Sequence, residues 1–229
     1  MSVINNVIIY DGIKYCQPAG TQTLCVIGFD NAFDTRNILK IPEAVNGILV
    51  DSVEEAAFYK SKIKSLILPE SLRVIKKDSF AECENLVEVL LMPVKYFQQK
   101  ECLLIDTRAF DGCCSLHSVV CHTKRIANIK RDAFHNCTNL YELGVKLQQL
   151  DGFALNQCQN LHTIHCHTIG MLKPFCLEGT DVKVIDIPQT CIIDAQVLER
   201  IRDYNILLRC GANSAIADLA YNGYNVEVI

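Results

Sequence analysis

Residues 65–86 read SLILPESLRVIKKDSFAECENL, and the end of this stretch returns along the chain in altered form. The phrase DSFAECENL at 78–86 is followed by RAFDGCCSL at 108–116, DAFHNCTNL at 132–140 and ALNQCQNL at 154–161. In each phrase a Phe or Leu, called the anchor below, is followed by Cys three residues later and by Leu six residues later. Self-similarity at a spacing of roughly 20–50 residues indicates a repeat architecture.

Apolar residues recur at fixed distances from these anchors. They stand eight and five residues before each anchor and nine and eleven residues after it. Two weaker copies flank the clear ones, with Phe58 as the upstream anchor and Cys176 as the downstream anchor. The full set of anchors is Phe58, Phe80, Phe110, Phe134, Leu155 and Cys176, spaced 22, 30, 24, 21 and 21 residues apart.

The spacing predicts the local structure of each copy. Residues nine and eleven after the anchor alternate as in a strand with one inward face. The anchor and the residues three and six after it have the spacing of a short helical turn. One copy cannot bury its apolar positions alone, so the copies must stack and bury them against each other.

The phrase at 65–86 closely resembles the BspA-like type of leucine-rich repeat. The resemblance implies an α/β repeat solenoid: a right-handed, β-rich array with a parallel concave sheet, short helical turns and a cap at both ends. Members from bacteria and protists are typically surface or secreted proteins of adhesion and host interaction. The departures from the pattern are an insertion at 94–104, a shortened turn at 146–155 and a degraded last copy around 168–179.

We expect a single leucine-rich repeat domain over residues 1–229. Residues 1–36 form the N-terminal cap, 37–188 hold about six repeats, and 189–229 form the C-terminal cap. In the latter, AQVLERIRD (195–203) has apolar residues at helical spacing. Asn213 and Ser214 are candidate N-caps of a second helix, which is followed by a last strand at 226–229.

Composition limits the class of protein. The chain has 229 residues, 50% of them hydrophobic, and a net charge of -4. This composition argues against disorder and against a generic nucleic-acid binder. No apolar run of about 18 residues exists, so no membrane span is expected. The 13 cysteines, an odd number, and a start unlike a signal peptide favour a cytoplasmic protein. The alternative is a cell-surface or secreted protein whose leader was removed.

The outward positions of the predicted sheet are candidate binding residues, because partners of repeat arrays usually occupy the concave face. One end of this face is apolar and the other is polar. The alternatives are that cap loops or a dimer mate cover the apolar end, or that aliphatic residues simply suit an exposed strand. The candidates for contact with a protein partner are Ile67, Leu90, Met92, Val120, Glu142, His165 and His167.

The cysteines three residues after the anchors predict an inward ladder of free thiols. Cys is a good small buried side chain, and the repeat pattern alone explains these positions. The ladder consists of Cys83, Cys113, Cys137 and Cys158. We also expect Cys121, Cys166 and Cys102 to be buried and Cys114 to be exposed.

The sequence gives little support for a catalytic site or a metal site. In HTIHCHT (162–168), His165 and His167 share a strand face, but a structural zinc site needs four ligands and no third is obvious. Cys121 and Cys166 each precede a histidine (His122 and His167), and adjacent strand residues point to opposite faces. No nucleotide-binding or hydrolase motif occurs.

We therefore expect a non-enzymatic protein-binding scaffold without metal or cofactor. The alternative is a surface or secreted adhesion module that binds host matrix protein or glycan. The identity of the partner and the oligomeric state stay open.

Overall fold

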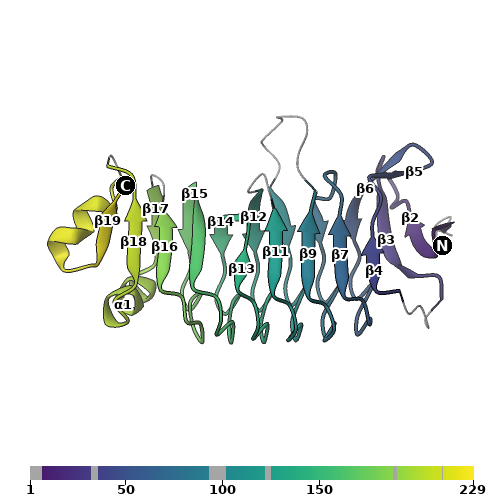
Figure 1. The fold of residues 1–229 in the computed structure, drawn as a ribbon. Helices are drawn as coiled ribbons and strands as arrows, with labels where there is room; N and C mark the ends of the chain where they lie inside the picture. The colour runs from purple at the N-terminus through teal and green to yellow at the C-terminus, as the bar shows by residue number, and fades with distance from the viewer. Residues whose placement is uncertain (1–6, 32–35, 93–101, 122–124, 188–189, 213) are drawn as a thin grey trace.

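The computed structural model describes residues 7–31, 36–92, 102–121, 125–187, 190–212 and 214–229. These residues form a β-solenoid of about seven turns, in which equivalent strands of successive coils lie side by side (Figure 1). The buried side chains make one continuous cluster from Ile13 to Ile216. The fold is the leucine-rich repeat solenoid that the sequence pattern predicts.

The strands that follow the anchors pair in parallel as one sheet, called the front sheet. It corresponds to the sheet that the repeat pattern predicts as the concave surface. Its strands are β4 (Ile38–Lys40), β7 (Ser65–Leu68), β9 (Glu88–Leu91), β11 (Ser118–Cys121) and β13 (Glu142–Leu143). The same face continues toward the C-terminus with the start of β15 (Thr163–Leu172), then β16 (Val184–Ile187), β18 (Leu207–Cys210) and β19 (Val226–Val228).

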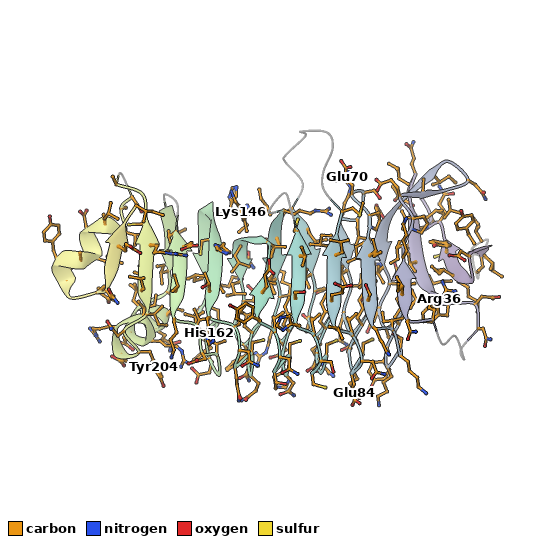
Figure 2. The ribbon with its side chains drawn as sticks, in the orientation of Figure 1. Arg36, Glu70, Glu84, Lys146, His162 and Tyr204 are labelled. Carbon is orange, nitrogen blue, oxygen red and sulfur yellow. The ribbon has the colours of Figure 1, made fainter. Side chains whose placement is uncertain are left out.

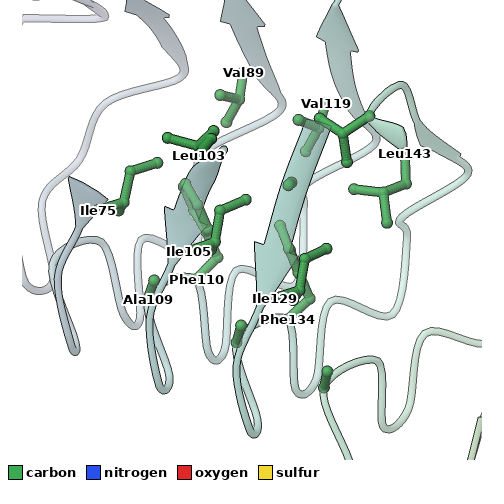
Figure 3. Close-up of a cluster of buried hydrophobic side chains, with 14 of the residues drawn as sticks. Ile75, Val89, Leu103, Ile105, Ala109, Phe110, Val119, Ile129, Phe134 and Leu143 are labelled. Carbon is green, nitrogen blue, oxygen red and sulfur yellow. The ribbon is translucent and has the colours of Figure 1, made fainter. Parts of the chain in front are cut away.

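The residues before the anchors form strands of their own, which make a second parallel wall called the back sheet. Its strands are β3 (Leu24–Phe29), β6 (Ile48–Val53), β8 (Val74–Ile75), β10 (Leu103–Ile105), β12 (Ile126–Ile129), β14 (Lys146–Leu150), the end of β15 and β17 (Thr190–Ile193). The core lies between the two walls (Figure 3).

The back sheet corrects the predicted inward position eight residues before the anchor in two coils. Cys102, expected inside at eight residues before its anchor, is only half-buried, while Leu103 is fully buried. The next coil repeats this, because Ala127 pairs with Leu103 and is buried in place of Ile126. In these two coils strand alternation explains the shift, since the residues five and seven before the anchor share the inward face. In the other coils Val50, Leu72 and Leu147, eight residues before their anchors, are buried as predicted.

Each coil turns around its anchor through a chain of tight turns at the lower edge of Figure 1. Around Phe80, the N–H of Ala81 donates to the carbonyl of Asp78 (3.1 Å) and that of Cys83 to the carbonyl of Phe80 (3.3 Å). Asp78 and Glu82 have φ values of 54° and 56°. These left-handed residues prevent a right-handed helix, so the predicted short helical turns are instead successive β-turns.

The anchor rings stack along the solenoid. Phe58, Phe80, Phe110 and Phe134 follow one another with ring centroids 5.3, 5.3 and 5.2 Å apart, and their planes are inclined by 12° or less. All four side chains are buried, as the pattern predicts. Leu155 continues the column in the next coil.

The last anchor is Leu177 and not Cys176. The N–H of Thr180 donates to the carbonyl of Leu177, which is the bond that the cysteine three residues after each clear anchor makes. Phe175 and Gly179 hold the left-handed positions two residues to either side of Leu177. Cys176 is buried just before the anchor, at the position that Ala109 and Ala133 occupy in earlier coils.

Both ends of the array carry different structures. At the N-terminus, β1 (Ile8–Tyr10), β2 (Ile13–Cys16) and β3 form an antiparallel sheet, and β5 (Ala44–Val45) pairs with β6. Near the C-terminus, α1 (Ala195–Asp203) is formed by the same residues for which a helix was predicted. The second predicted helix is the 3-10 helix η1 (Ala217–Asn222), which ends at Gly223. The predicted N-cap Asn213 lies outside the described residues.

We expect Phe110→Ala to lower the free energy of unfolding by about 3–5 kcal/mol, because it leaves a cavity between two stacked rings. Denaturant titration measures the loss. Phe175→Ala is the control, since Phe175 is 46% exposed and stacks on Phe153; it should cost less than about 1.5 kcal/mol. Equal losses for the two variants would contradict the assignment of the core.

Candidate functional site on the front sheet

An apolar row crosses the outer face of the front sheet. Ile67, Leu90 and Val120 are direct cross-strand partners on β7, β9 and β11. Each side chain is half-buried, and Met92, just beyond β9, is 39% exposed. The structure thus places these four candidates outward, as the strand pattern predicts, and sets Leu90 directly between Ile67 and Val120. The apolar row below means Ile67, Leu90 and Val120.

The sheet opens beside this row. The N–H groups of Tyr141 and Glu142 both donate to the carbonyl of His117, and the same paired bonds recur between most neighbouring coils. In the described part of the chain no such bonds run from His162 or Thr163 to the carbonyl of Tyr141, and β13 pairs only with β11. The front face therefore has a seam between β13 and β15.

Gly144 lies next to the seam, directly after β13. A Cβ atom on this residue would lie 2.8 Å from the carbonyl oxygen of Val119 and 3.0 Å from the amide nitrogen of Cys121. Only glycine lets the backbone come this close to β11 without a shift of its neighbours. At Gly144, just after the end of β13, the backbone therefore lies close to β11 and on the side away from β15.

A hollow of about 320 Å³ lies over the seam. Its outer walls are polar and aromatic: the Tyr141 ring stacks on His117 at 5.6 Å and meets the edge of His162 at 6.3 Å. His162 lies toward the lower end of the front sheet in Figure 2. The hollow is lined by Cys121, Tyr141, Glu142, Leu143, Gly144, His162, Thr163 and His165.

His165 is held in place by a series of side-chain contacts with Asp186 and Arg209, which lie on the next two strands of the sheet. Its Nδ1 lies 2.7 Å from Oδ2 of Asp186. Arg209 then donates to both oxygens of Asp186, from Nε at 2.6 Å and from Nη2 at 2.9 Å. Because Asp186 occupies Nδ1, the nitrogen left to meet a ligand in the hollow is Nε2.

His167 does not join this site. β15 crosses from the front face, where His165 pairs with Asp186, to the back sheet, where Cys166 pairs with Leu147. Beyond this corner, burial and the neighbouring charge of Lys146 lower the pKa of His167. Within the described residues no three His, Cys, Asp or Glu side chains form a group that could hold a metal ion. His122 lies outside those residues.

Five of the seven predicted site residues divide between two features, and Met92 and His167 belong to neither. Ile67, Leu90 and Val120 form the apolar row, and Glu142 and His165 line the hollow. The sequence analysis missed Tyr141, His162 and Arg209. The first two stand seven residues after their anchors, as His117 does, so a column of rings at this position was readable from the repeat.

The cysteine ladder is inward and fully buried, as predicted. Each thiol donates to the carbonyl of the preceding anchor, as Cys113 does to Phe80 at 3.2 Å. Burial raises the pKa of Cys113, Cys137 and Cys158, which disfavours the thiolate form that a nucleophile needs. Cys121 and Cys166 are also buried, and Cys114 is exposed.

We expect Gly144→Ala to destabilise the chain by about 1–3 kcal/mol, because the added Cβ overlaps the backbone of β11. Thermal or urea unfolding measures this. Glu142→Ala, an exposed change two residues earlier on β13, is the control and should stay within about 0.5 kcal/mol. If Gly144→Ala were as mild as the control, the close approach to β11 would be wrong.

Comparison with known proteins gives a family. The chain matches the family model for the BspA type leucine rich repeat region (6 copies) at residues 23–102, 51–141 and 95–202. No curated protein matches the chain. None of the helices in the described residues has the length and the apolar run that a membrane crossing requires.

Solved structures show the same fold. A leucine rich cell surface protein from Faecalibacterium prausnitzii is 19% identical with a TM-score of 0.61, covering 91% of this chain and 55% of that protein. A leucine-rich repeat protein from Bacteroides ovatus is 17% identical with a TM-score of 0.50, covering 96% of this chain and 66% of that protein. The chain therefore spans only part of the length of both. From its repeat pattern, its stacked coils and the family match, the chain belongs to the BspA-type leucine-rich repeat family.

Proposed function

We propose that this chain is a non-enzymatic protein-binding scaffold whose contact surface is the outer face of the front sheet. The repeats at residues 37–188 would present the surface, and the caps at residues 1–36 and 189–229 would close the two ends. Membership of the leucine-rich repeat family supports a scaffold, because stacked repeats create extended binding faces. The observation that carries the proposal is the apolar row.

The apolar row has the layout of an interface centre. It spans two strand steps, or roughly 10 Å. On one side lie the polar residues of the next outward position, where the hydroxyl of Ser65 donates to Glu88 at 2.9 Å. Protein interfaces combine an apolar centre with a polar rim. Ser65, Glu88 and Ser118 would supply that rim, and a partner would bury the three aliphatic side chains.

The second candidate function is that of a surface or secreted adhesion module, and the hollow favours it. Tyr141 gives an exposed ring, and Glu142, Thr163 and His165 give both acceptors and donors around it. Rings beside fixed polar groups suit the apolar faces and hydroxyls of a sugar. The printed name of the Faecalibacterium protein, a cell surface protein, also supports this reading.

We expect Val120→Asp to weaken partner capture by about tenfold or more, because it places a charge at the centre of the apolar row. Affinity capture from a lysate of the source cells, with quantitative mass spectrometry, compares it with the unaltered chain. Ser118→Asp adds the same charge to the rim of the same strand and should capture the partner nearly as well.

Thermal unfolding accompanies this comparison. Both variants should keep the Tm within a few degrees of the unaltered chain, since neither side chain belongs to the core cluster. Equal capture by both aspartate variants would remove the apolar row from the proposal, and a large fall in Tm for Val120→Asp would mean that the side chain is core.

For the second candidate function, a glycan array with the unaltered chain should give at least one specific signal. Tyr141→Ala and His165→Ala should abolish this signal, because each removes a wall of the hollow. Tyr221→Ala changes a ring that is 91% exposed at the C-terminal end and should keep the signal. An array without any specific signal would exclude the glycan-binding form of this function.

A further inference from the structure

Two cysteines outside the ladder lie unusually close together. Cys16 on β2 and Cys25 on β3 are direct partners in the antiparallel N-terminal sheet. Their sulfur atoms are 2.8 Å apart. Carbon atoms, which are no larger than sulfur, make their best contacts at about 3.5–4.0 Å. Two unbonded thiols would therefore rest farther apart than these two sulfurs do.

The backbone geometry suits a covalent bond. Directly opposed residues of an antiparallel pair have Cα atoms about 4.5–5.5 Å apart, within the range of about 4.4–6.8 Å that a disulfide accepts. The pair also differs from the ladder cysteines, whose thiols all point to carbonyl groups of the preceding coil. Neither Cys16 nor Cys25 belongs to the main core cluster, although both are buried.

We propose that Cys16 and Cys25 are a disulfide site that closes the β2–β3 hairpin when the chain meets an oxidising thiol–disulfide pool. The oxidant is a low-molecular-weight disulfide such as oxidised glutathione. The closed bond spans residues 17–24 and ties β2 to β3, which pairs directly with β6 of the first coil. It thereby fixes the N-terminal cap to the repeat array.

The reaction has two exchange steps. The thiolate of Cys16, the more exposed of the two at 8% against 1%, attacks one sulfur of oxidised glutathione and displaces one glutathione thiolate. The thiolate of Cys25 then attacks Sγ of Cys16, forms the intrachain bond and displaces the second glutathione. Two electrons pass to the glutathione, and the two protons of the cysteines end on the two thiols released.

Position, and not acidity, suits Cys25 to the second step. Burial, and then the neighbouring Cys16 and Glu54, raise the pKa of its thiol. A thiol of this kind reacts slowly with reagents in solution. Its partner sulfur is already within 2.8 Å, so the closing step needs little movement. The ladder thiols are fully buried, which keeps them away from oxidised glutathione in the folded chain.

A peptide map of the full chain tests the site. The chain is equilibrated with oxidised and reduced glutathione, then unfolded, alkylated and digested with trypsin. Cys16 and Cys25 fall in one tryptic peptide, residues 15–36, because Lys14 and Arg36 flank them and no Lys or Arg lies between. We expect this peptide to lack both alkyl groups and to be two hydrogen atoms lighter than its reduced form. Peptides with Cys83, Cys113, Cys137 and Cys158 should be alkylated.

Thermal unfolding adds an independent readout. Closure should raise the Tm by a few degrees, and dithiothreitol should reverse the rise. Cys16→Ser should leave Cys25 alkylated and remove the rise, whereas Cys114→Ser, which removes an exposed cysteine elsewhere, should change neither result.

The peptide map of the unaltered chain does not depend on how any variant folds. A peptide 15–36 with two alkyl groups would overturn the proposal. So would a stable glutathione adduct on Cys16, or a bond from either cysteine to a different partner.

Discussion

The stacking of each coil on the next is the interaction on which the rest of this molecule depends. A single coil of some 21–30 residues has its Phe, Cys and Leu side chains open on both flat sides, and only the neighbouring coils cover them. The rings of Phe58, Phe80, Phe110 and Phe134 therefore lie face against face at 5.2–5.3 Å. Each ladder thiol donates to a carbonyl of the coil before it, which fixes the same register at every step.

This register also determines what the surface can offer. Because equivalent residues of successive coils are cross-strand partners, one outward position per coil becomes a row across the front sheet. A change of residue type along the row then becomes a change of surface, from Ile67, Leu90 and Val120 to His165, Asp186 and Arg209. The hollow lies between the two halves, where Gly144 is drawn against β11 and the ladder of hydrogen bonds stops.

Much of the fold followed from the repeat alone, because the positions of buried side chains recur with the coil. The outward position of Leu90 and the buried anchors Phe80 and Phe110 needed only strand alternation and spacing. The errors arose where one residue was gained or lost. Cys102 was placed inside because the alignment counted eight residues from Phe110, although two-residue alternation selects Leu103.

The candidate site was harder to foresee than the fold. Glu142 and His165 were recognised as outward residues. The seam, however, arises because β13 does not pair with β15, and no residue pattern in the sequence predicts this break. The left-handed turns at Asp78 and Glu82 were likewise hidden, because turns and a short helix share a three-residue spacing. Cys16 and Cys25 are neighbours because of the register of the β2–β3 hairpin. The cap contains no sequence repeat from which this register could have been predicted.

A double-mutant cycle on the ring column is the most direct test of stacked coils. The adjacent pair Phe80→Leu and Phe110→Leu should show a coupling free energy of about 0.5–1.5 kcal/mol, because these rings touch. The pair Phe58→Leu and Phe134→Leu, separated by two intervening rings, should be additive within about 0.3–0.5 kcal/mol. Equal coupling in both pairs, or none in the adjacent pair, would contradict a solenoid in which each coil is sealed by its immediate neighbours.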